Sequence, residues 1–518
     1  MINLFLEKLL EFYNLDYDTL IEENEKTLND LPQKEIFKDG SKIASYIREA
    51  ILSNKKILIY GDYDCDGIMS TSILMLALST EEYKPGYYIP SREFDGYGLT
   101  KGNVDRFYKL GYQVIICVDN GITLNETIDY ASSLGIEVIV LDHHKLGPII
   151  PNAKYIMHPE YDHFGKYNIS AGVVSFYFSL FYLNRFDDYL FSLCALSTLS
   201  DSMPLLSYNR LIVKEALNLI NKNHYEEIFT LLSDQNKEIN EDDLNMQVIP
   251  KINAICRLLN DNSRFNIVKY FISKDRETIL KLSSWINSIN ERRKELVNSV
   301  NLNEENNNSN ALIYINKENE GIGGLIANKL LNRYNKVTFV LSKSESDKNI
   351  YKGSARSKKG FDIAKFMASN ADLFLAYGGH ENAGGFSILK DKYLDLKNVL
   401  EKETKDISFK EDKNYIEIAL NELNLKNYDI YRQFAPFGEG HIKPRFKISR
   451  LNINDLKNFI YNKHILYRVN EETSILIFNF DREILEASFI DVFGYISLNT
   501  FRNIKSVQLI VDEYELIY

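Results

Sequence analysis

The sequence predicts a multidomain α/β protein, and three observations support that fold class. Residues 49 to about 160 alternate short apolar runs with helical patterns, as expected of a parallel sheet covered by helices. A second strand–helix–strand pattern begins at Ala311, after a long helix and a polar linker. From about residue 400 onward, apolar and polar residues alternate in short segments, which is typical of a small β domain.

The first sheet is predicted from three apolar runs at 57–60, 114–118 and 138–141. They are rich in Val and Ile and do not alternate, so we expect parallel strands that are buried on both faces. Ligands of such sheets bind beyond the carboxyl ends of the strands, and each run ends there in polar residues. These residues are Asp62, Asp64 and Asp66 after the first run, Asp119 after the second, and Asp142, His143 and His144 after the third. A solvated acidic turn is the alternative for the first stretch alone, but three such endings at one edge favour a binding site.

The remaining elements follow from helical periodicity and linker composition. After residue 168 we expect helices at 171–183, 189–199 and 209–221, and Asp201 lies just beyond the second of them. A long helix at 277–300 is either a rigid spacer or ordinary core, and the polar stretch 301–310 is a linker. Strands are expected at 311–315 and 337–341, with a helix at 325–334 between them, and further strands at 415–420, 474–480 and 506–511. The predicted units are an N-terminal helical segment at 1–48, a catalytic domain at 49–275, the connecting helix and linker at 276–305, a smaller α/β domain at 306–395 and a β domain at 396–518.

Composition narrows the class of protein. The net charge of −11 over 518 residues argues against nucleic-acid binding by the whole surface, but it is compatible with a local basic channel. Four cysteines without CxxC spacing argue against a disulfide framework and suit a reducing cytoplasm. The N-terminus lacks the pattern of a signal peptide, and no apolar run is long enough to span a membrane.

The acidic and histidine residues indicate a divalent-metal site. Carboxylate oxygens with imidazole suit Mn²⁺, Mg²⁺ or Zn²⁺, and the lack of thiolates favours the two harder ions. There are enough ligands for two ions, and Asp119 is central enough to bridge them. His143 and His144 are adjacent and cannot both point the same way, so one is expected to ligate and the other to face a phosphate.

Four motifs resemble those of the DHH phosphoesterases, in order and at similar spacing. They are GDYDCDG, VDNG, LDHH and the Ser-Asp of LSDSMPL. Further segments over about residues 45–460 resemble the RecJ family of 5′→3′ exonucleases specific for single-stranded DNA, namely IPSREFDGYGL, IPKINAICRL, KGSARS, YGGHENAGG and FAPFGEGHIKPRF. The resemblance implies that the catalytic domain is a DHH domain, that the smaller α/β domain is a DHHA1 substrate-binding domain, and that the C-terminal part is an OB-like β-barrel.

The resemblance also implies residue roles. One metal would be held by Asp64 and Asp119 with Asp62 nearby, and the other by Asp66, Asp119, His143 and Asp201. Asp142 would orient His143, and His144 would contact the scissile phosphate. Arg92, Ser354 and Arg356 would bind phosphates, including the 5′ end. Arg257 and His380, with the adjoining Gly378 and Gly379, would hold the backbone near the cut.

Two groups of residues and two departures from the family pattern allow more than one interpretation. The basic run 352–359 suits phosphate binding, although a solvated charged surface is the usual explanation for such a run. The aromatic residues Phe459, Tyr461, Tyr467, Phe478 and Phe480 could stack on bases, but core packing is expected for most of them. The chain departs from the family pattern at Ile255-Cys256 and at Glu320, where many relatives carry a histidine.

Three functions are considered. The favoured one is a 5′→3′ exonuclease on single-stranded DNA that uses two Mn²⁺ or Mg²⁺ ions, releases mononucleotides, and serves DNA repair and recombination. A DHH enzyme acting on short oligoribonucleotides or cyclic dinucleotides is the second, but such relatives usually lack the β domain. A non-catalytic single-strand-binding scaffold is the third, and it would have no reason to keep clustered acids. We expect a cytoplasmic monomer without membrane contact, with a single-strand-binding protein and a helicase as partners.

Overall fold

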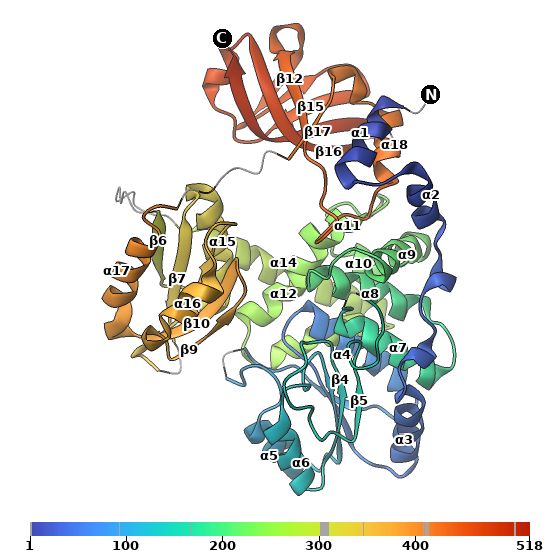
Figure 1. The fold of residues 1–518 in the computed structure, drawn as a ribbon. Coiled ribbons are helices and arrows are strands. Elements are labelled where there is room, and N and C mark those ends of the chain that lie inside the picture. The colour runs from blue at the N-terminus through green and yellow to red at the C-terminus, as the bar shows by residue number, and fades with distance from the viewer. Residues whose placement is uncertain are drawn as a thin grey trace.

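The computed structural model describes residues 3–92, 94–166, 168–300, 310–344, 347–407, 409, 414–501 and 504–517. The chain forms three β-sheet units joined by a helical region (Figure 1). Among the described residues, no helix combines the length and the apolar character needed to cross a bilayer. The four cysteines are buried and free, in agreement with the prediction that the chain has no disulfide framework.

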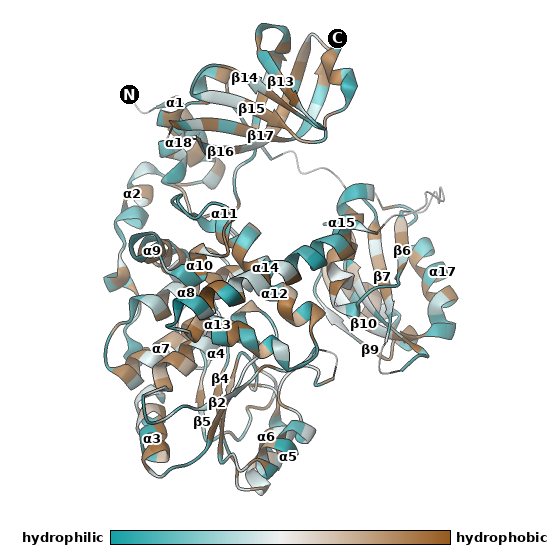
Figure 2. Cartoon of the chain, turned by 180° about the vertical axis from the view of Figure 1, so that it is seen from behind, coloured by the Kyte–Doolittle hydropathy of each residue, from teal (hydrophilic) through white to brown (hydrophobic). Residues whose placement is uncertain are grey.

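The first unit contains a five-stranded parallel sheet of order β2-β1-β3-β4-β5. Its three central strands are almost wholly buried, and in Figure 2 the strands of this sheet are largely brown. The predicted strands at 57–60, 114–118 and 138–141 are confirmed to within one residue. The strands are β1 Ile57–Tyr60, β2 Gly86–Tyr88, β3 Val114–Val118, β4 Glu137–Leu141 and β5 Tyr155–Met157.

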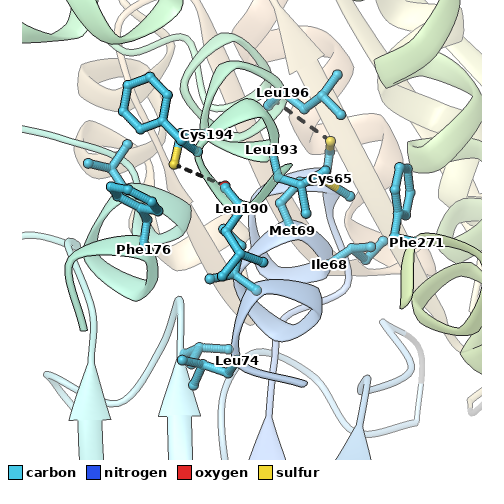
Figure 3. Close-up of a cluster of buried hydrophobic side chains, with 14 of the residues drawn as sticks. Cys65, Ile68, Met69, Leu74, Phe176, Leu190, Leu193, Cys194, Leu196 and Phe271 are labelled. Atoms are coloured by element: carbon cyan, nitrogen blue, oxygen red, sulfur yellow. Dashed lines mark hydrogen bonds between the residues drawn. The ribbon is translucent and has the colours of Figure 1, made fainter. Parts of the chain in front are cut away.

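Helices cover both faces of this sheet and build two separate cores. One face packs on α5 and α6, and the other packs on α3, α4, α7 and the helices behind them. Helix α4 is buried on nearly all sides because it lies between the sheet and the layer formed by α7, α8 and α13. Figure 3 shows its Cys65, Ile68, Met69 and Leu74 packed against side chains of those three helices. The helices of this layer system are α3 Gly40–Leu52, α4 Cys65–Leu78, α5 Lys101–Lys109, α6 Asn125–Ser133, α7 Ala171–Leu183, α8 Asp188–Ser200 and α13 Asn266–Ile272.

A helical region connects this unit to the rest of the molecule. It comprises α9 Tyr208–Asn223, α10 Glu226–Phe229, α11 Glu241–Asp243, a π-helical turn at Leu244–Val248, α12 Ile249–Leu258 and α14 Arg276–Asn298. The first half of α14 contributes Ile279, Leu282 and Ile286 to the core of the first unit, whereas Leu296 and Val297 pack near α15 of the next unit. The long helix is therefore both core and spacer. The predicted linker at 301–310 lies outside the described residues except for Asn310.

The second unit is a five-stranded mixed sheet of order β6-β7-β8-β10-β9. Its elements are β6 Ala311–Asn316, α15 Gly323–Tyr334, β7 Val337–Lys343, β8 Ile350–Arg356, α16 Ile363–Ser369, β9 Ala376–Gly379, β10 Ala383–Leu389 and α17 Tyr393–Glu403. Helix α17 packs Leu396 and Leu400 into the core of this sheet. The unit therefore extends to Glu403, beyond the boundary at 395 drawn from the sequence.

The third unit is a seven-stranded sheet of order β11-β12-β16-β17-β15-β14-β13, which fits an OB-like fold. Its elements are β11 Ile416–Glu417, α18 Leu425–Arg432, β12 Phe446–Asn452, β13 Lys457–Tyr461, β14 His464–Arg468, β15 Thr473–Ile477, β16 Phe489–Phe501 and β17 Ile504–Ile517. The strand expected at 415–420 is much shorter than predicted, because Leu420–Glu422 forms a 3₁₀ turn.

The N-terminal helices α1 Leu4–Tyr13 and α2 Tyr17–Glu25 do not form a unit of their own. Phe5, Leu9 and Leu20 belong to the hydrophobic core of the third unit, so the first helices of the chain pack on its last sheet (Figure 1). The buried side chain of Glu241 in the helical region accepts two hydrogen bonds from Arg432 of α18, at 2.9 and 3.0 Å. The third unit is thereby attached to the helical region through this ion pair.

Candidate metal centre and phosphate cleft

The three acids of the first motif lie where β1 passes into α4. Asp62 is buried, Asp64 is the N-cap of α4 and accepts a hydrogen bond from the N–H of Gly67, and Asp66 is in the first helical turn. Gly67 has a steric role here, because a Cβ at this position would lie 2.5 Å from the backbone nitrogen of Asp62. This close approach folds the three carboxylates into one small region.

Asp66 is fixed by the start of α7. Its two carboxylate oxygens accept hydrogen bonds from the N–H groups of Ala171 and Gly172, both at 2.9 Å, and Ser197 of α8 donates its hydroxyl to the same carboxylate. A helix N-terminus favours the negative charge of a carboxylate. Burial and the neighbouring Asp64 nevertheless raise the pKa of Asp66 to about 7, so the carboxylate is a candidate to be neutralised by a cation.

Asp119 follows β3 in a left-handed backbone conformation, with φ of 62°. Its N–H donates to the carbonyl of Leu141 at 3.1 Å, and its side chain is buried. The next residue, Asn120, donates its side-chain amide to the carbonyls of Gly61 and Val118 at 3.2 and 2.9 Å. Asn120 therefore ties the end of β1 to the end of β3 and brings the first two motifs together.

His143 is surrounded by carboxylates from three elements. Its Nε2 lies 3.3 Å from Asp119 Oδ1, 3.5 Å from Asp201 Oδ2 and 3.6 Å from Asp66 Oδ2. Burial and the neighbouring His144 lower the pKa of His143 to about 3, so the ring is neutral. Neither ring nitrogen of His143 has a hydrogen-bond partner among the described residues, and the same holds for Asp62 Oδ1. Buried polar atoms without partners are costly, and a cation would satisfy them.

Asp142 orients a different ring from the one expected. Its Oδ1 lies 2.8 Å from Nδ1 of His144 and accepts from the backbone N–H of His143, while its Oδ2 accepts from the N–H of Ile122. The prediction that Asp142 orients His143 was wrong, because the His143 ring turns toward the carboxylates on the other side. Burial lowers the pKa of His144, but the bond to Asp142 outweighs it and raises that pKa to about 9. His144 is thus held as a cation, and Asp142 keeps its charge.

The full set forms three overlapping ligand groups whose donor atoms lie within 4.8 Å of one another. Asp119 belongs to two of them, which suits a bridging role between two ions. Burial and mutual repulsion raise the pKa of Asp62 and Asp119, and burial with Asp66 raises that of Asp201 to about 8. The groups are Asp62, Asp64 and Asp119; Asp66, His143 and Asp201; and Asp119, His143 and His144.

A cleft of about 480 Å³ separates the first and second units and adjoins the ligand groups. Tyr63, Arg92 and Tyr97 line it from the first unit, and Lys352 and Ser354 line it from the second. The ring of Tyr97 also contacts His144, with centroids 5.5 Å apart. Two residues of the cleft lining, Tyr63 and Tyr97, are therefore direct neighbours of the carboxylate–histidine cluster.

Three arginines gather beside this cleft. Burial and the nearby Arg92 and Arg356 lower the pKa of Arg257 to about 10, while Asp64 opposes the shift. A Cβ on Gly321 would lie 2.1 Å from the carbonyl oxygen of Arg257, so this glycine lets the second unit approach the end of α12. Guanidinium groups in close array match phosphate oxygens. The structure thus brings Arg92, Arg257, Ser354 and Arg356 together.

Other predicted residues lie elsewhere. Gly378 and Gly379 are exposed on β9 at the edge of the second sheet, and His380 is exposed in the turn that follows. The cleft is lined by their neighbour Tyr377 instead. Ile255 and Cys256 are buried in the catalytic-domain core, so this departure from the family does not obstruct Arg257.

The C-terminal aromatic residues are more exposed than expected. Phe459, Tyr461 and Phe478 are 40%, 76% and 48% exposed, whereas Tyr467 is buried. The expectation of core packing was wrong for these three. They lie on β13 and just after β15, where Lys457 and Arg468 stand over the ring of Phe459.

Comparison with known proteins identifies the three units. Family models match residues 56–196 as the DHH family N-terminal domain, 307–406 as the DHHA1 domain and 416–513 as the RecJ OB domain. The chain contains a DHH domain, a DHHA1 domain and a RecJ OB domain. The predicted domain types and their order are therefore confirmed.

Several RecJ proteins are similar over most of this chain. The single-stranded-DNA-specific exonuclease RecJ of Bacillus subtilis is 29% identical over 91% of this chain and 62% of its own length. The Escherichia coli RecJ is 26% identical over 91% of this chain and 89% of its own length. This chain thus spans less than two thirds of the Bacillus relative. The crystal structure of Thermus thermophilus RecJ in complex with Mn²⁺ has the same fold, with a TM-score of 0.78 and 21% identity over 93% of this chain and 72% of that one.

Sequence reasoning missed two groups of supporting residues. Asn120 stands inside the VDNG motif, so its position beside Asp119 was an available signal. Ser197 and the N-terminus of α7, which hold Asp66, carry no sequence signal. They lie more than 100 residues from Asp66 and meet it only in the folded chain.

Proposed function

We propose that the chain is a metal-dependent exonuclease that degrades single-stranded DNA from its 5′ end and releases 5′-mononucleotides. The observation that carries this proposal is the cleft lined by Arg92 and Lys352 beside the carboxylate–histidine cluster. A terminal phosphate bound by the arginines would place the adjoining phosphodiester beside the cluster. The similar RecJ proteins, named as single-stranded-DNA-specific exonucleases, support the same substrate.

The cluster is proposed to hold two Mn²⁺ or Mg²⁺ ions. Asp62, Asp64 and Asp119 would bind one, and Asp66, Asp119, His143 and Asp201 would bind the other. Hard divalent ions prefer such oxygen-rich sets, and the RecJ structures with Mn²⁺ and Mg²⁺ agree with this choice. When bound, the ions would supply Lewis acidity and neutralise charge on the phosphoryl group.

The chain's own residues would bind and orient the substrate. His144, held protonated by Asp142, would donate to a non-bridging oxygen of the scissile phosphate. Arg92, Ser354 and Arg356 would bind the 5′ phosphate, and Arg257 would bind the backbone next to it. His380, Gly378 and Gly379 would contact the DNA only if the DNA strand extends as far as the exposed sheet edge at β9.

The OB domain is proposed to hold the incoming strand. Phe459, Tyr461 and Phe478 expose ring faces beside Lys457 and Arg468, a combination that suits stacking on bases and contact with phosphates. This arrangement favours a long single strand over cyclic dinucleotides or short oligonucleotides. A role in DNA repair and recombination, a cytoplasmic location, a monomeric state and contacts with a single-strand-binding protein and a helicase complete the proposal.

The test uses end-labelled substrates in Mn²⁺. The protein is incubated with single-stranded DNA labelled at either end, duplex DNA and RNA, and product size is read over time. We expect the substrate labelled at its 5′ end to release labelled mononucleotides at once. The substrate labelled at its 3′ end should give labelled fragments that shorten with time, and both results are expected on single-stranded DNA only. Asp119→Ala, which removes the shared ligand, is expected to remain folded and to abolish cleavage. Full activity in that variant, or release from the 3′ end, would refute the proposal.

A further inference from the structure

Arg264 is a buried arginine that lies outside both the ligand cluster and the cleft. It is 3% exposed and follows α12 by a short loop. Its Nε donates to the carbonyl of Ile89 at 2.9 Å, and its Nη1 donates to the carbonyls of Asn260 and Asp261 at 2.8 and 2.7 Å. Ile89 stands three residues before Arg92, and Asn260 stands three residues after Arg257. One guanidinium thus joins the two backbone segments that carry two cleft arginines.

A second set of contacts holds the segment next to Arg92. Asp95 Oδ2 accepts hydrogen bonds from the N–H of Ser91 at 2.7 Å and from the hydroxyl of Tyr88 at 3.0 Å. The same oxygen lies 3.8 Å from Nη2 of Arg264. Ser91 also donates its hydroxyl to the side chain of Asn260 at 3.0 Å. The residue directly before Arg92 is therefore tied both to Asp95 and to the segment after Arg257.

The cleft needs such a brace because its cationic groups repel one another. Burial and the nearby Arg92 lower the pKa of both Arg257 and Arg356, and Arg356 adds to the shift of Arg257. The rings of Tyr88 and Phe265 hold Arg264 in place, with its guanidinium carbon 5.7 and 4.8 Å from their centroids.

We propose that Arg264 is a positioning residue that fixes the spacing between Arg92 and Arg257, so that both can bind the phosphates at one 5′ end. This inference rests on the proposed function, because it requires those two arginines to bind phosphate. A residue that merely stabilises the fold would affect every substrate alike. A positioning residue of this kind affects substrates with a terminal phosphate most.

The test variant is Arg264→Lys, which keeps the charge but cannot reach three carbonyls from one planar group. The matched control is Arg106→Lys. Arg106 also stands over the ring of Tyr88, at 5.2 Å, and donates to its hydroxyl, but none of its hydrogen bonds among the described residues joins the two backbone segments. KM and kcat are measured in Mn²⁺ with 5′-phosphorylated DNA, 5′-hydroxyl DNA and bis(p-nitrophenyl) phosphate, a small diester without a terminal phosphate.

We expect Arg264→Lys to raise KM for the phosphorylated strand by about tenfold, because misplacement of a binding group by about 1 Å is costly. Its activity on the small diester and its kcat are expected to match the control. An unchanged preference for phosphorylated ends, or an equal loss on all three substrates, overturns the inference. If Arg264→Lys shows no cooperative melt, Ser91→Ala must show a smaller rise confined to the phosphorylated strand, and its absence also overturns the inference.

The variant Arg92→Ala distinguishes a failure of the positioning role of Arg264 from a failure of the proposed 5′-phosphate binding. If Arg92→Ala keeps the preference for phosphorylated ends, the proposed 5′ anchor itself is wrong. If Arg92→Ala loses that preference while Arg264→Lys keeps it, the anchor stands and only the positioning role of Arg264 fails.

Discussion

The described side chains in the centre divide into those whose buried polar atoms lack a partner and those that already have one. Asp142 and His144 satisfy each other at 2.8 Å, whereas His143 and Asp62 keep buried atoms without partners among the described residues. This division distinguishes the proposed proton donor, His144 with Asp142, from the residues that are suited to bind a cation. It also explains why Asp142 and Asp119, both buried aspartates, have pKa values that move in opposite directions.

Replacing Asp142 with Asn is expected to lower the pKa of His144 from about 9 toward its usual value of about 6.5, because the carboxylate charge on Nδ1 is lost. His144 would then lose its proton at a lower pH. We expect the alkaline limb of the kcat/KM profile to move down by at least about one pH unit. Asp187→Asn serves as the control, because Asp187 caps the N-terminus of α8, at the opposite end of that helix from Asp201. An alkaline limb that stays in place would show that His144 is not the proton donor.

Glu320 places a carboxylate in a cleft that is proposed to bind phosphate. Its Oε1 pairs with Nζ of Lys352 at 3.0 Å, and its side chain is 12% exposed. Glu320→Gln is expected to free this lysine, to tighten binding of single-stranded DNA and to steepen the dependence of log Kd on log salt by about 0.7. Glu318→Gln, a neighbour that does not line the cleft, is the control in the same fluorescence titration. Equal slopes for the two variants would mean that Lys352 does not reach the DNA.

At the scale of elements, the sequence was most informative where strands are buried on both faces. The strands β1, β3 and β4 and the acids that follow them were predictable, since continuous apolar runs and a shared carboxyl edge fix both. The role of Asn120 could also have been predicted from its motif, but the hydrogen bonds from α7 to Asp66 depend on tertiary packing. The β domain was less predictable, because which face of a short strand is buried depends on its partners. Phe459 and Tyr461 are exposed for that reason, on a strand at the edge of its sheet.

The N-terminus of α7 offers a test at this scale. A Cβ on Gly172 would lie 2.4 Å from the Ser197 hydroxyl and 3.5 Å from Oδ1 of Asp66. Gly172→Ala is expected to destabilise the fold by about 1–3 kcal/mol through overpacking and to weaken Mn²⁺ binding by moving Asp66. Gly102→Ala is the control: Gly102 is also the second residue of its helix, and a Cβ there meets only the Thr100 side chain, at 4.0 Å. It is expected to be neutral or to stabilise by up to about 1 kcal/mol.

Thermal melts and calorimetric Mn²⁺ titrations of the two glycine variants distinguish the cases. Loss of stability without loss of metal affinity in Gly172→Ala would mean that α7 supports the fold but does not position Asp66.

At the scale of the whole molecule, the attachment of the OB domain can be followed by pH. His441 is 9% exposed, its ring lies 4.5 Å from that of Tyr13, and its Nε2 bonds to the carbonyl of Phe434 at 2.7 Å. Burial, with the nearby Arg210, lowers the pKa of His441 to about 4. The unfolded chain takes up the proton first as the pH falls below about 6.5, so folding stability is lost from there down to about pH 4.

We expect this group to cost about 3 kcal/mol of unfolding free energy between pH 7 and pH 4. His441→Gln keeps a donor for Phe434 but does not titrate, so it should lose less stability than the unmodified chain over that range. His464→Gln on β14 is the control. Urea unfolding at several pH values measures the difference, and parallel curves for all three proteins would contradict the assignment to His441.

The packing of α1 on the last sheet has a consequence for biosynthesis. Phe5 stacks on Phe446, 441 residues further along the chain, with ring centroids 5.8 Å apart. At a translation rate of about 5–20 residues per second, this apolar helix leaves the ribosome roughly 20 to 90 seconds before the strand that it packs on has been synthesised. During that interval the apolar face of α1 would be exposed on the nascent chain, where chaperones can bind it. Ribosome profiling after a chaperone pull-down should detect chaperone-bound nascent chains from the synthesis of α1 until that of β12.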